Sequence, residues 1–182
     1  MEIYLVRHTS VNVPPGYAYG QTDVPLNDTF EEEAAEVKKN LNTYADLVEI
    51  PFEKVWSSPL SRCVRLAAYC GYADAVRDDR LKEISFGEWE MKSWEEISED
   101  PRSEAWFADW LHVPTPGGES LTDQYTRVSR FLEEIKKGPE EKVCLFAHGG
   151  VLTCARVWAG EYQLEEAFKN VPSYGAVIRL EV

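Results

Sequence analysis

The sequence predicts an α/β protein with a mostly parallel central sheet, and three observations support this class. Short apolar runs rich in β-forming residues alternate with longer segments in which apolar residues recur at helical spacing. Two of the runs, residues 3–6 and 143–147, are apolar throughout, as expected for strands that are covered on both faces. No repeat, low-complexity tract or linker interrupts the alternation, so we expect a single domain over residues 1–182.

The first half of the chain is expected to contain three short strands and two helices. The strands are expected at residues 3–6, which are apolar throughout, and at residues 54–57 and 73–76. Residues 9–27 are rich in Pro and Gly and predict a long loop, and long ordered loops are often functional. Thr29 is expected to cap a helix with an acidic first turn. The apolar positions of that helix recur at helical spacing: Phe30, Ala34, Val37, Leu41, Tyr44 and Leu47 or Val48.

The second helix is expected directly after the strand at residues 54–57. Ser58 and Pro59 are predicted to cap and start it, because Pro is favoured at the first helical position, and Gly71 ends it. Residues 77–92 predict a loop that is dense in charge.

The second half of the chain is expected to contain a short helix, two further helices and two strands. Ser93 and Glu96 have the capping-box spacing, which predicts a short helix, and an aromatic stretch at residues 106–110 is expected to pack in the core. A longer helix follows the break at residues 114–118, with apolar residues alternately three and four positions apart: Leu121, Tyr125, Val128, Leu132 and Ile135. The last elements are expected at residues 142–147 (strand), 151–159 (helix) and 176–182 (strand).

Composition and charge exclude several function classes. The net charge of −13, from 19 Lys and Arg against 32 Asp and Glu, argues against nucleic acid and anionic membranes as partners, because both require a basic surface. No apolar run could span a membrane, and no signal-peptide pattern is present, so a cytoplasmic location is expected. The cysteines form no CxxC pair and are expected to be structural thiols: Cys63, Cys70, Cys144 and Cys154.

Two of the three histidines follow the two clearest strands of the sequence. His8, preceded by Arg7, follows the strand at residues 3–6, and His148 follows the strand at residues 142–147. Ligands of open α/β sheets bind outside the carboxyl ends of the strands, and an Arg beside an imidazole suits a phosphate group. His112 lies in an aromatic stretch with no such partner, and we expect it to be structural or exposed.

Further candidates lie at helix starts and in one loop. Arg62, near the start of a helix, and Gly149, which opens another, would present N–H donors to an anion. A carboxyl group partly desolvated by Phe86 and Trp89 would suit a general acid. The residues alone leave three carboxylates open for that role: Glu83, Glu88 and Glu90.

Five sequence blocks together resemble the histidine phosphatase superfamily, in the branch that includes cofactor-dependent phosphoglycerate mutases. The blocks occur in the family's order and span nearly the whole chain: Arg7 to Thr9, Ser57 to Arg62, Leu81 to Glu90, Pro116 to Ser120 and Ala147 to Val151. Each block is weak alone, but five in order are specific.

The resemblance implies a phosphoglycerate mutase-like fold, a three-layer α/β/α sandwich. It implies that His8 is the nucleophile and becomes a phosphohistidine, and that Arg7, Arg62 and His148 bind the phosphoryl oxygens. Glu83 occupies the family's general-acid position. The implied partner is a small-molecule phosphate ester, and no metal or organic cofactor is implied.

The loop after His8 departs from many relatives, which place an Asn six residues after the nucleophile. Pro14 stands there, and the nearest Asn is Asn12, so Gln21 and Thr22 are candidates to supply the missing phosphate donors. The loop is similar to that of bacterial α-ribazole phosphatases, which act late in cobalamin assembly, although Ala18 stands where that branch often has Cys.

The expected function is therefore a phosphomonoesterase acting on α-ribazole 5′-phosphate. Three alternatives stay open: a phosphoglycerate mutase, a broad small-molecule phosphatase, and a non-catalytic phosphate-binding protein.

Overall fold

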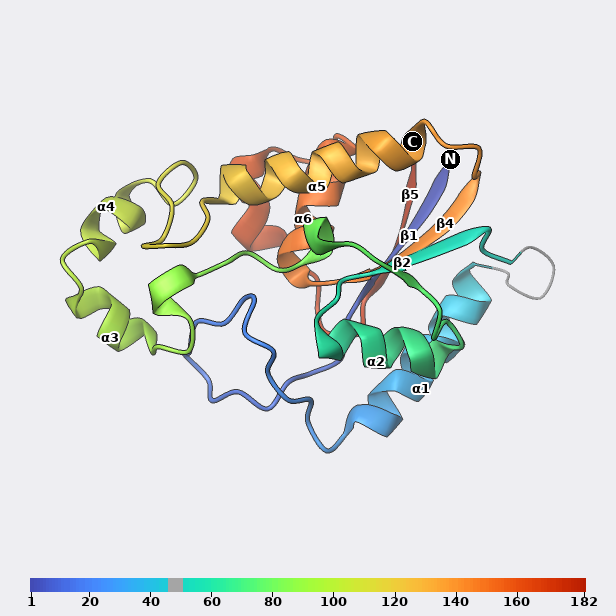
Figure 1. The fold of residues 1–182 in the computed structure, drawn as a ribbon, viewed down its shortest axis with the longest axis horizontal. Helices are drawn as coiled ribbons and strands as arrows, with labels where there is room; N and C mark the ends of the chain where they lie inside the picture. Colours follow the sequence, from blue (N-terminus) through green and yellow to red (C-terminus); the bar gives the residue numbers. More distant parts are fainter. Residues whose placement is uncertain (46–50) are drawn as a thin grey trace.

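A five-stranded sheet forms the centre of the protein, seen in a computed structural model that describes residues 1–45 and 51–182 (Figure 1). The strands are β1 (Glu2–Arg7), β2 (Lys54–Ser57), β3 (Val76–Arg77), β4 (Lys142–Ala147) and β5 (Val177–Glu181). Their order in the sheet is β3-β2-β4-β1-β5. All neighbours are parallel except β1 and β5, which are antiparallel, so the predicted mostly parallel sheet is confirmed.

Helices cover both faces of the sheet. The long helices are α1 (Phe30–Tyr44), α2 (Ser61–Cys70), α5 (Leu121–Lys136) and α6 (Gly149–Trp158). Side chains of a strand alternate between faces, so Ile3 and Leu5 pack with residues of α5 and α6, while Tyr4 and Val6 pack with residues of α1 and α2. Figure 1 shows the two helix pairs on opposite sides of the sheet, which confirms the three-layer α/β/α class.

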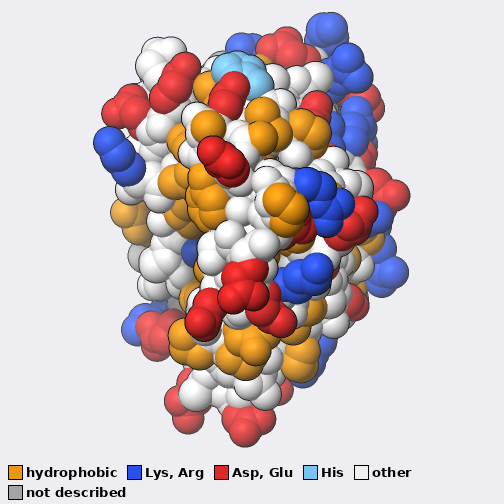
Figure 2. Space-filling model, turned by 90° about the vertical axis from the view of Figure 1, so that its left-hand side faces the viewer, with side chains coloured by type: hydrophobic (Ala, Val, Ile, Leu, Met, Phe, Trp, Pro, Cys, Tyr) orange, Lys and Arg blue, Asp and Glu red, His pale blue; other side chains and the backbone are white. Residues whose placement is uncertain are grey.

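Two short helices, α3 (Trp94–Glu99) and α4 (Ser103–Ala108), lie beyond one end of the sheet (Figure 1). Their side chains form a separate small core in which Trp94 and Trp106 stack with ring centroids 5.7 Å apart. Trp106 is buried, as expected for the aromatic stretch, but its neighbour Phe107 is exposed. Figure 2 shows this end of the molecule, where hydrophobic side chains lie among acidic ones.

Several predicted boundaries were wrong, and local hydrogen bonds explain one of them. Helix α2 begins at Ser61 after Leu60 at the N-cap, not at Pro59. The Ser58 hydroxyl accepts the Leu60 N–H and lies 2.7 Å from a ring nitrogen of His148, so Ser58 serves the site as well as the turn. The third strand, expected at residues 73–76, is β3 at Val76–Arg77. Helix α6 begins at Gly149, the residue expected to open it.

The start of α1 and the loops also differ in part from what the sequence predicts. Thr29 occupies the N-cap of α1, but its hydroxyl bonds the Glu33 side chain rather than the helix backbone. The positions Leu47 and Val48 lie outside the described residues. Short 3₁₀ helices, which the patterns did not predict, occur in the charged loop and before β5: η1 (Asp79–Leu81), η2 (Gly87–Trp89) and η3 (Leu164–Asn170).

The four cysteines lie where the patterns placed them, three on helices and Cys144 in β4, and all are buried free thiols. Among the described residues, no helix is both long and apolar enough to cross a membrane.

Candidate active site

The register of β1 and β4 brings His8 and His148 together. Arg7 pairs with Ala147 at the carboxyl ends of these neighbouring parallel strands, so the two histidines that follow are adjacent. Their ring centroids are 5.2 Å apart, and both side chains are buried. The sequence placed each histidine after a strand, and the sheet order makes those two strands neighbours.

The ring of His8 is uncharged, and its Nε2 has no hydrogen-bond partner among the described residues. Its Nδ1 lies 2.7 Å from the carbonyl oxygen of Thr9, and because a carbonyl only accepts hydrogen bonds, Nδ1 carries the proton. Burial, with the positive charges of Arg62 and Arg7, lowers the pKa of His8 to about 3. The lone pair of Nε2 is therefore available over the whole neutral pH range.

Arg7 lies beside this ring with one donor unused. Its Cζ lies 4.1 Å from the ring centre of Tyr174, and Nη1 donates to the carbonyl of Pro172. Its Nε is buried and has no partner among the described residues. A Cβ at Gly149 would lie 3.1 Å from the Arg7 Cζ, so a glycine at the start of α6 lets the guanidinium lie against the helix end.

Arg62 is fully buried and links three parts of the site. Its Nε donates to Nδ1 of His148 at 3.3 Å, which leaves the proton of that ring on Nε2, facing Ser58. Its other nitrogens donate to the carbonyls of Gly20 and Thr22 in the long loop. Burial, followed by the Arg62 charge, holds the pKa of His148 well below its usual value.

Glu83 lines a cavity together with Arg7 and His8. Its carboxylate accepts hydrogen bonds from the Ile84 N–H (2.9 Å), the Gln124 side chain (2.7 Å) and the Gly150 N–H (3.0 Å).

The other two carboxylates that the sequence left open are held elsewhere. Glu88 is exposed and pairs with Arg102 at 2.9 Å. Burial of Glu90 opposes its ionisation, but hydrogen bonds from the Thr22 side chain and from backbone N–H groups lower its pKa. Of the two aromatics expected to desolvate the acid, Phe86 lines the cavity, whereas Trp89 is buried in the small core and bonds Asp100.

Most of the remaining cavity wall is apolar. Trp110, which follows α4, and Phe168 of η3 pack against each other in this wall with ring centroids 4.4 Å apart. The cavity is lined by Arg7, His8, Tyr19, Glu83, Ile84, Phe86, Trp106, Trp110, Leu121, Gln124, Gly149, Gly150, Thr153, Ala167, Phe168 and Val171. Arg7 is the single cationic residue in that set, so the wall can bind one anionic group and an apolar remainder.

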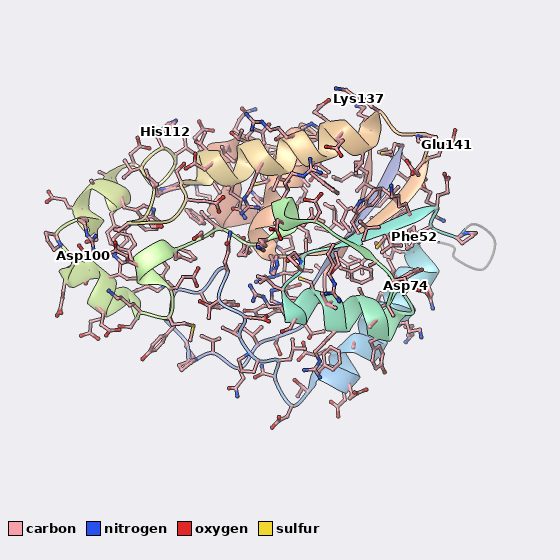
Figure 3. All side chains as sticks on the ribbon, viewed as in Figure 1. Phe52, Asp74, Asp100, His112, Lys137 and Glu141 are labelled. Carbon is pink, nitrogen blue, oxygen red and sulfur yellow. The ribbon has the colours of Figure 1, made fainter. Side chains whose placement is uncertain are left out.

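Gln21 and Thr22 bond protein atoms in this structure. The Thr22 hydroxyl donates to Glu90 at 2.7 Å, and the Gln21 side chain donates to the Glu83 carbonyl at 3.1 Å. Their proposed contact with phosphate stays a prediction. His112 is exposed, as expected, with Nδ1 2.9 Å from Asp109, and lies at the surface near α5 (Figure 3).

The sequence reasoning missed two residues that hold Glu83. Arg127 donates to the Glu83 carbonyl at 3.0 Å and pairs with Glu119, which fastens the loop to α5. Gln124 bonds the carboxylate itself. A signal existed for Gln124: it is a polar residue three positions after Leu121 on the apolar stripe of a helix.

No group of three or more His, Cys, Asp or Glu side chains is placed to hold a metal ion in the described residues. The arrangement is an α/β/α sandwich with two uncharged histidines, two arginines and a carboxylate at the carboxyl edge of its sheet. Such a site can bind one phosphate group beside a free imidazole nitrogen.

Comparison with known proteins identifies the family. Residues 3–182 match the histidine phosphatase superfamily (branch 1), and the chain belongs to this superfamily. The Adenosylcobalamin/alpha-ribazole phosphatase of Salmonella typhimurium is 30% identical, with 84% of this chain and 76% of that protein aligned. The Putative phosphoserine phosphatase 2 of Hydrogenobacter thermophilus is also 30% identical, over 82% and 74%.

Solved structures agree with the fold. The crystal structure of TTHB049 from Thermus thermophilus is 31% identical to this chain, with a TM-score of 0.73 and coverage of 98% of this chain and 92% of that one. The resemblance inferred from the five blocks is thereby confirmed at the level of the family.

Proposed function

We propose that this protein is a phosphomonoesterase that works through a phosphohistidine at His8, with α-ribazole 5′-phosphate as its substrate. The observation that carries the proposal is the cavity that joins His8 and Glu83 to an apolar, aromatic wall. α-Ribazole 5′-phosphate has one phosphate and a flat benzimidazole, which match one cationic group and that wall.

In the first step, Nε2 of His8 attacks phosphorus, and the bond to the ester oxygen breaks. Glu83, as the acid, protonates the leaving oxygen. In the second step, Glu83 takes a proton from water, which attacks phosphorus and breaks the P–N bond. The neutral ring of His8 supports the nucleophilic role, because a protonated imidazole has no lone pair to offer.

The phosphoryl oxygens would be bound by residues around His8. The unpartnered Nε of Arg7 is one donor, and the start of α6 at Gly149 favours negative charge. Arg62 would exchange its bonds to the carbonyls of the long loop for bonds to phosphoryl oxygens, with His148 beside it. Phosphoryl transfer depends mainly on such positioning and fixed positive charge.

The cavity favours this substrate over smaller phosphate esters that carry a carboxylate. Phosphoserine and phosphoglycerate each need a cationic group for the carboxylate besides Arg7 and Arg62, which bind the phosphate in this proposal, and the described residues that line the cavity include no other. A negative group without a partner loses its hydration without compensation.

The test combines a substrate panel with trapping of the intermediate. Purified protein should show its highest kcat/KM on α-ribazole 5′-phosphate, compared with phosphoserine, 3-phosphoglycerate and sugar phosphates. A sample quenched in base during turnover should carry acid-labile phosphate on His8, and His8→Ala should carry none.

Other outcomes separate the alternatives. A higher kcat/KM on a carboxylate ester would contradict the substrate, and phosphate on serine would contradict the mechanism. Phosphohistidine that is passed to a second hydroxyl without hydrolysis would indicate a mutase. Ester binding without release of phosphate, unchanged in His8→Ala, would indicate a phosphate-binding protein.

A further inference from the structure

The Glu83 carboxylate is held by three N–H donors, and one of them is a side chain. The Ile84 N–H and the Gln124 amide both donate to Oε1, at 2.9 and 2.7 Å. The Gly150 N–H donates to Oε2 at 3.0 Å. Oε1 therefore accepts two hydrogen bonds and Oε2 accepts one. This leaves Oε2 as the carboxylate oxygen that can carry the proton.

Only the N–H₂ half of the Gln124 amide has a hydrogen-bond partner among the described residues, and that partner is Glu83. It is fully buried on α5 and lines the same cavity as His8 and Glu83. Its Oε1 has no partner among the described residues, so one half of a buried amide goes unused while the other half bonds Glu83.

The start of α6 fits closely around the Gln124 contact. A Cβ at Gly150 would lie 2.3 Å from Oε1 of Glu83 and 2.8 Å from Nε2 of Gln124. The absence of a side chain at Gly150 therefore lets the helix end, the amide and the carboxylate meet. This close packing restricts the Gln124 side chain to the position from which it donates.

We propose that Gln124 is a positioning residue that fixes the Glu83 carboxyl group and leaves Oε2 to give and receive the catalytic proton. The proposal rests on the proposed function, in which Glu83 donates that proton to the leaving oxygen and then takes one from water. Gln124 contributes a donor that no backbone group replaces.

The test is the ratio of kcat/KM on α-ribazole 5′-phosphate to kcat/KM on p-nitrophenyl phosphate for Gln124→Leu. A displaced acid slows the ester with a poor leaving group and not the activated one, so this ratio should fall about tenfold, the size expected for a hydrogen bond to a charged group. The inhibition constant of inorganic phosphate should stay within about twofold, since phosphate binding does not use this amide.

Two variants make the test decisive. Gln124→Met keeps the side-chain length without a donor and should lower the ratio equally, and a ratio of two rates does not depend on the fraction of folded protein. Thr153→Val removes another buried polar group from the same cavity wall, one whose hydroxyl donates to the Gly149 carbonyl within α6, and should leave the ratio unchanged.

A ratio that stays at the wild-type value in both Gln124 variants overturns the inference. Failure of the proposed function is a different result, because wild-type protein would then form no phosphohistidine at His8.

Discussion

Replacing His8 with Asn should make the protein less sensitive to mild acid. His8 is 2% exposed, and its pKa in the folded protein is about 3, against an ordinary value of 6.5. Above pH 6.5 the ring is neutral in both the folded and the unfolded chain. Below that pH the unfolded chain binds a proton that the folded chain excludes, so stability falls as the pH is lowered towards 3.

The size of the effect follows from the two pKa values. At pH 5 the unfolded ring is protonated and the folded ring is not, which costs the folded state about 2 kcal/mol relative to neutral pH. Asn at this position has no titratable group, and its amide can still donate to the Thr9 carbonyl that Nδ1 bonds. The substitution should therefore flatten the dependence of stability on pH, whatever constant change it adds.

The assay is urea unfolding of the wild type and of His8→Asn between pH 5 and pH 7.5. The difference in unfolding free energy between them should change by about 2 kcal/mol over this range, in favour of Asn at low pH. His112→Asn is the matched control, because it removes an exposed histidine at the surface (Figure 3). Parallel curves for wild type and His8→Asn would refute the argument that His8 is held neutral.

Two further predictions concern catalysis. Glu83→Gln should slow the hydrolysis of α-ribazole 5′-phosphate by about 10²-fold or more. It should slow the hydrolysis of p-nitrophenyl phosphate by less than about tenfold, because an activated leaving group needs no general acid. Equal slowing of both reactions in steady-state assays would place the acid elsewhere. Trp110→Ala should raise the KM for α-ribazole 5′-phosphate about tenfold, since Trp110 packs on Phe168 in the cavity wall, and leave the KM for phosphoserine within about twofold. A parallel rise for both substrates would show that the aromatic wall does not select the base.

The sequence by itself determined the fold class and the main chemical groups. The apolar runs that become β1 and β4 are buried on both faces, and such strands leave an unambiguous pattern. Arg7 ends β1, and His8 and His148 directly follow β1 and β4, so their place at the sheet edge was predictable from their positions alone. The family followed from five blocks in order, which local patterns carry without any knowledge of contacts.

Other local predictions failed where a side chain had two choices of partner. Ser58 could cap the next helix or bind His148. In the folded protein its hydroxyl lies 2.7 Å from His148, and helix α2 begins only at Ser61. Trp89 could line the cavity beside the acid or fill the small core, and its indole N–H bonds Asp100 in that core. Propensity describes one residue at a time and does not contain this competition.

The tertiary structure alone decided which carboxylate faces His8 and what holds it there. Residue types in the charged loop left Glu83, Glu88 and Glu90 equivalent, and the resemblance favoured Glu83. The folded chain separates them because Arg102, the backbone of the long loop, and Gln124 with Gly150 each bind a different one. These partners lie up to about seventy residues away in sequence. The packing of α5 and α6 brings Gln124 and Gly150 to Glu83, and the path of the long loop brings Gly20 to Glu90.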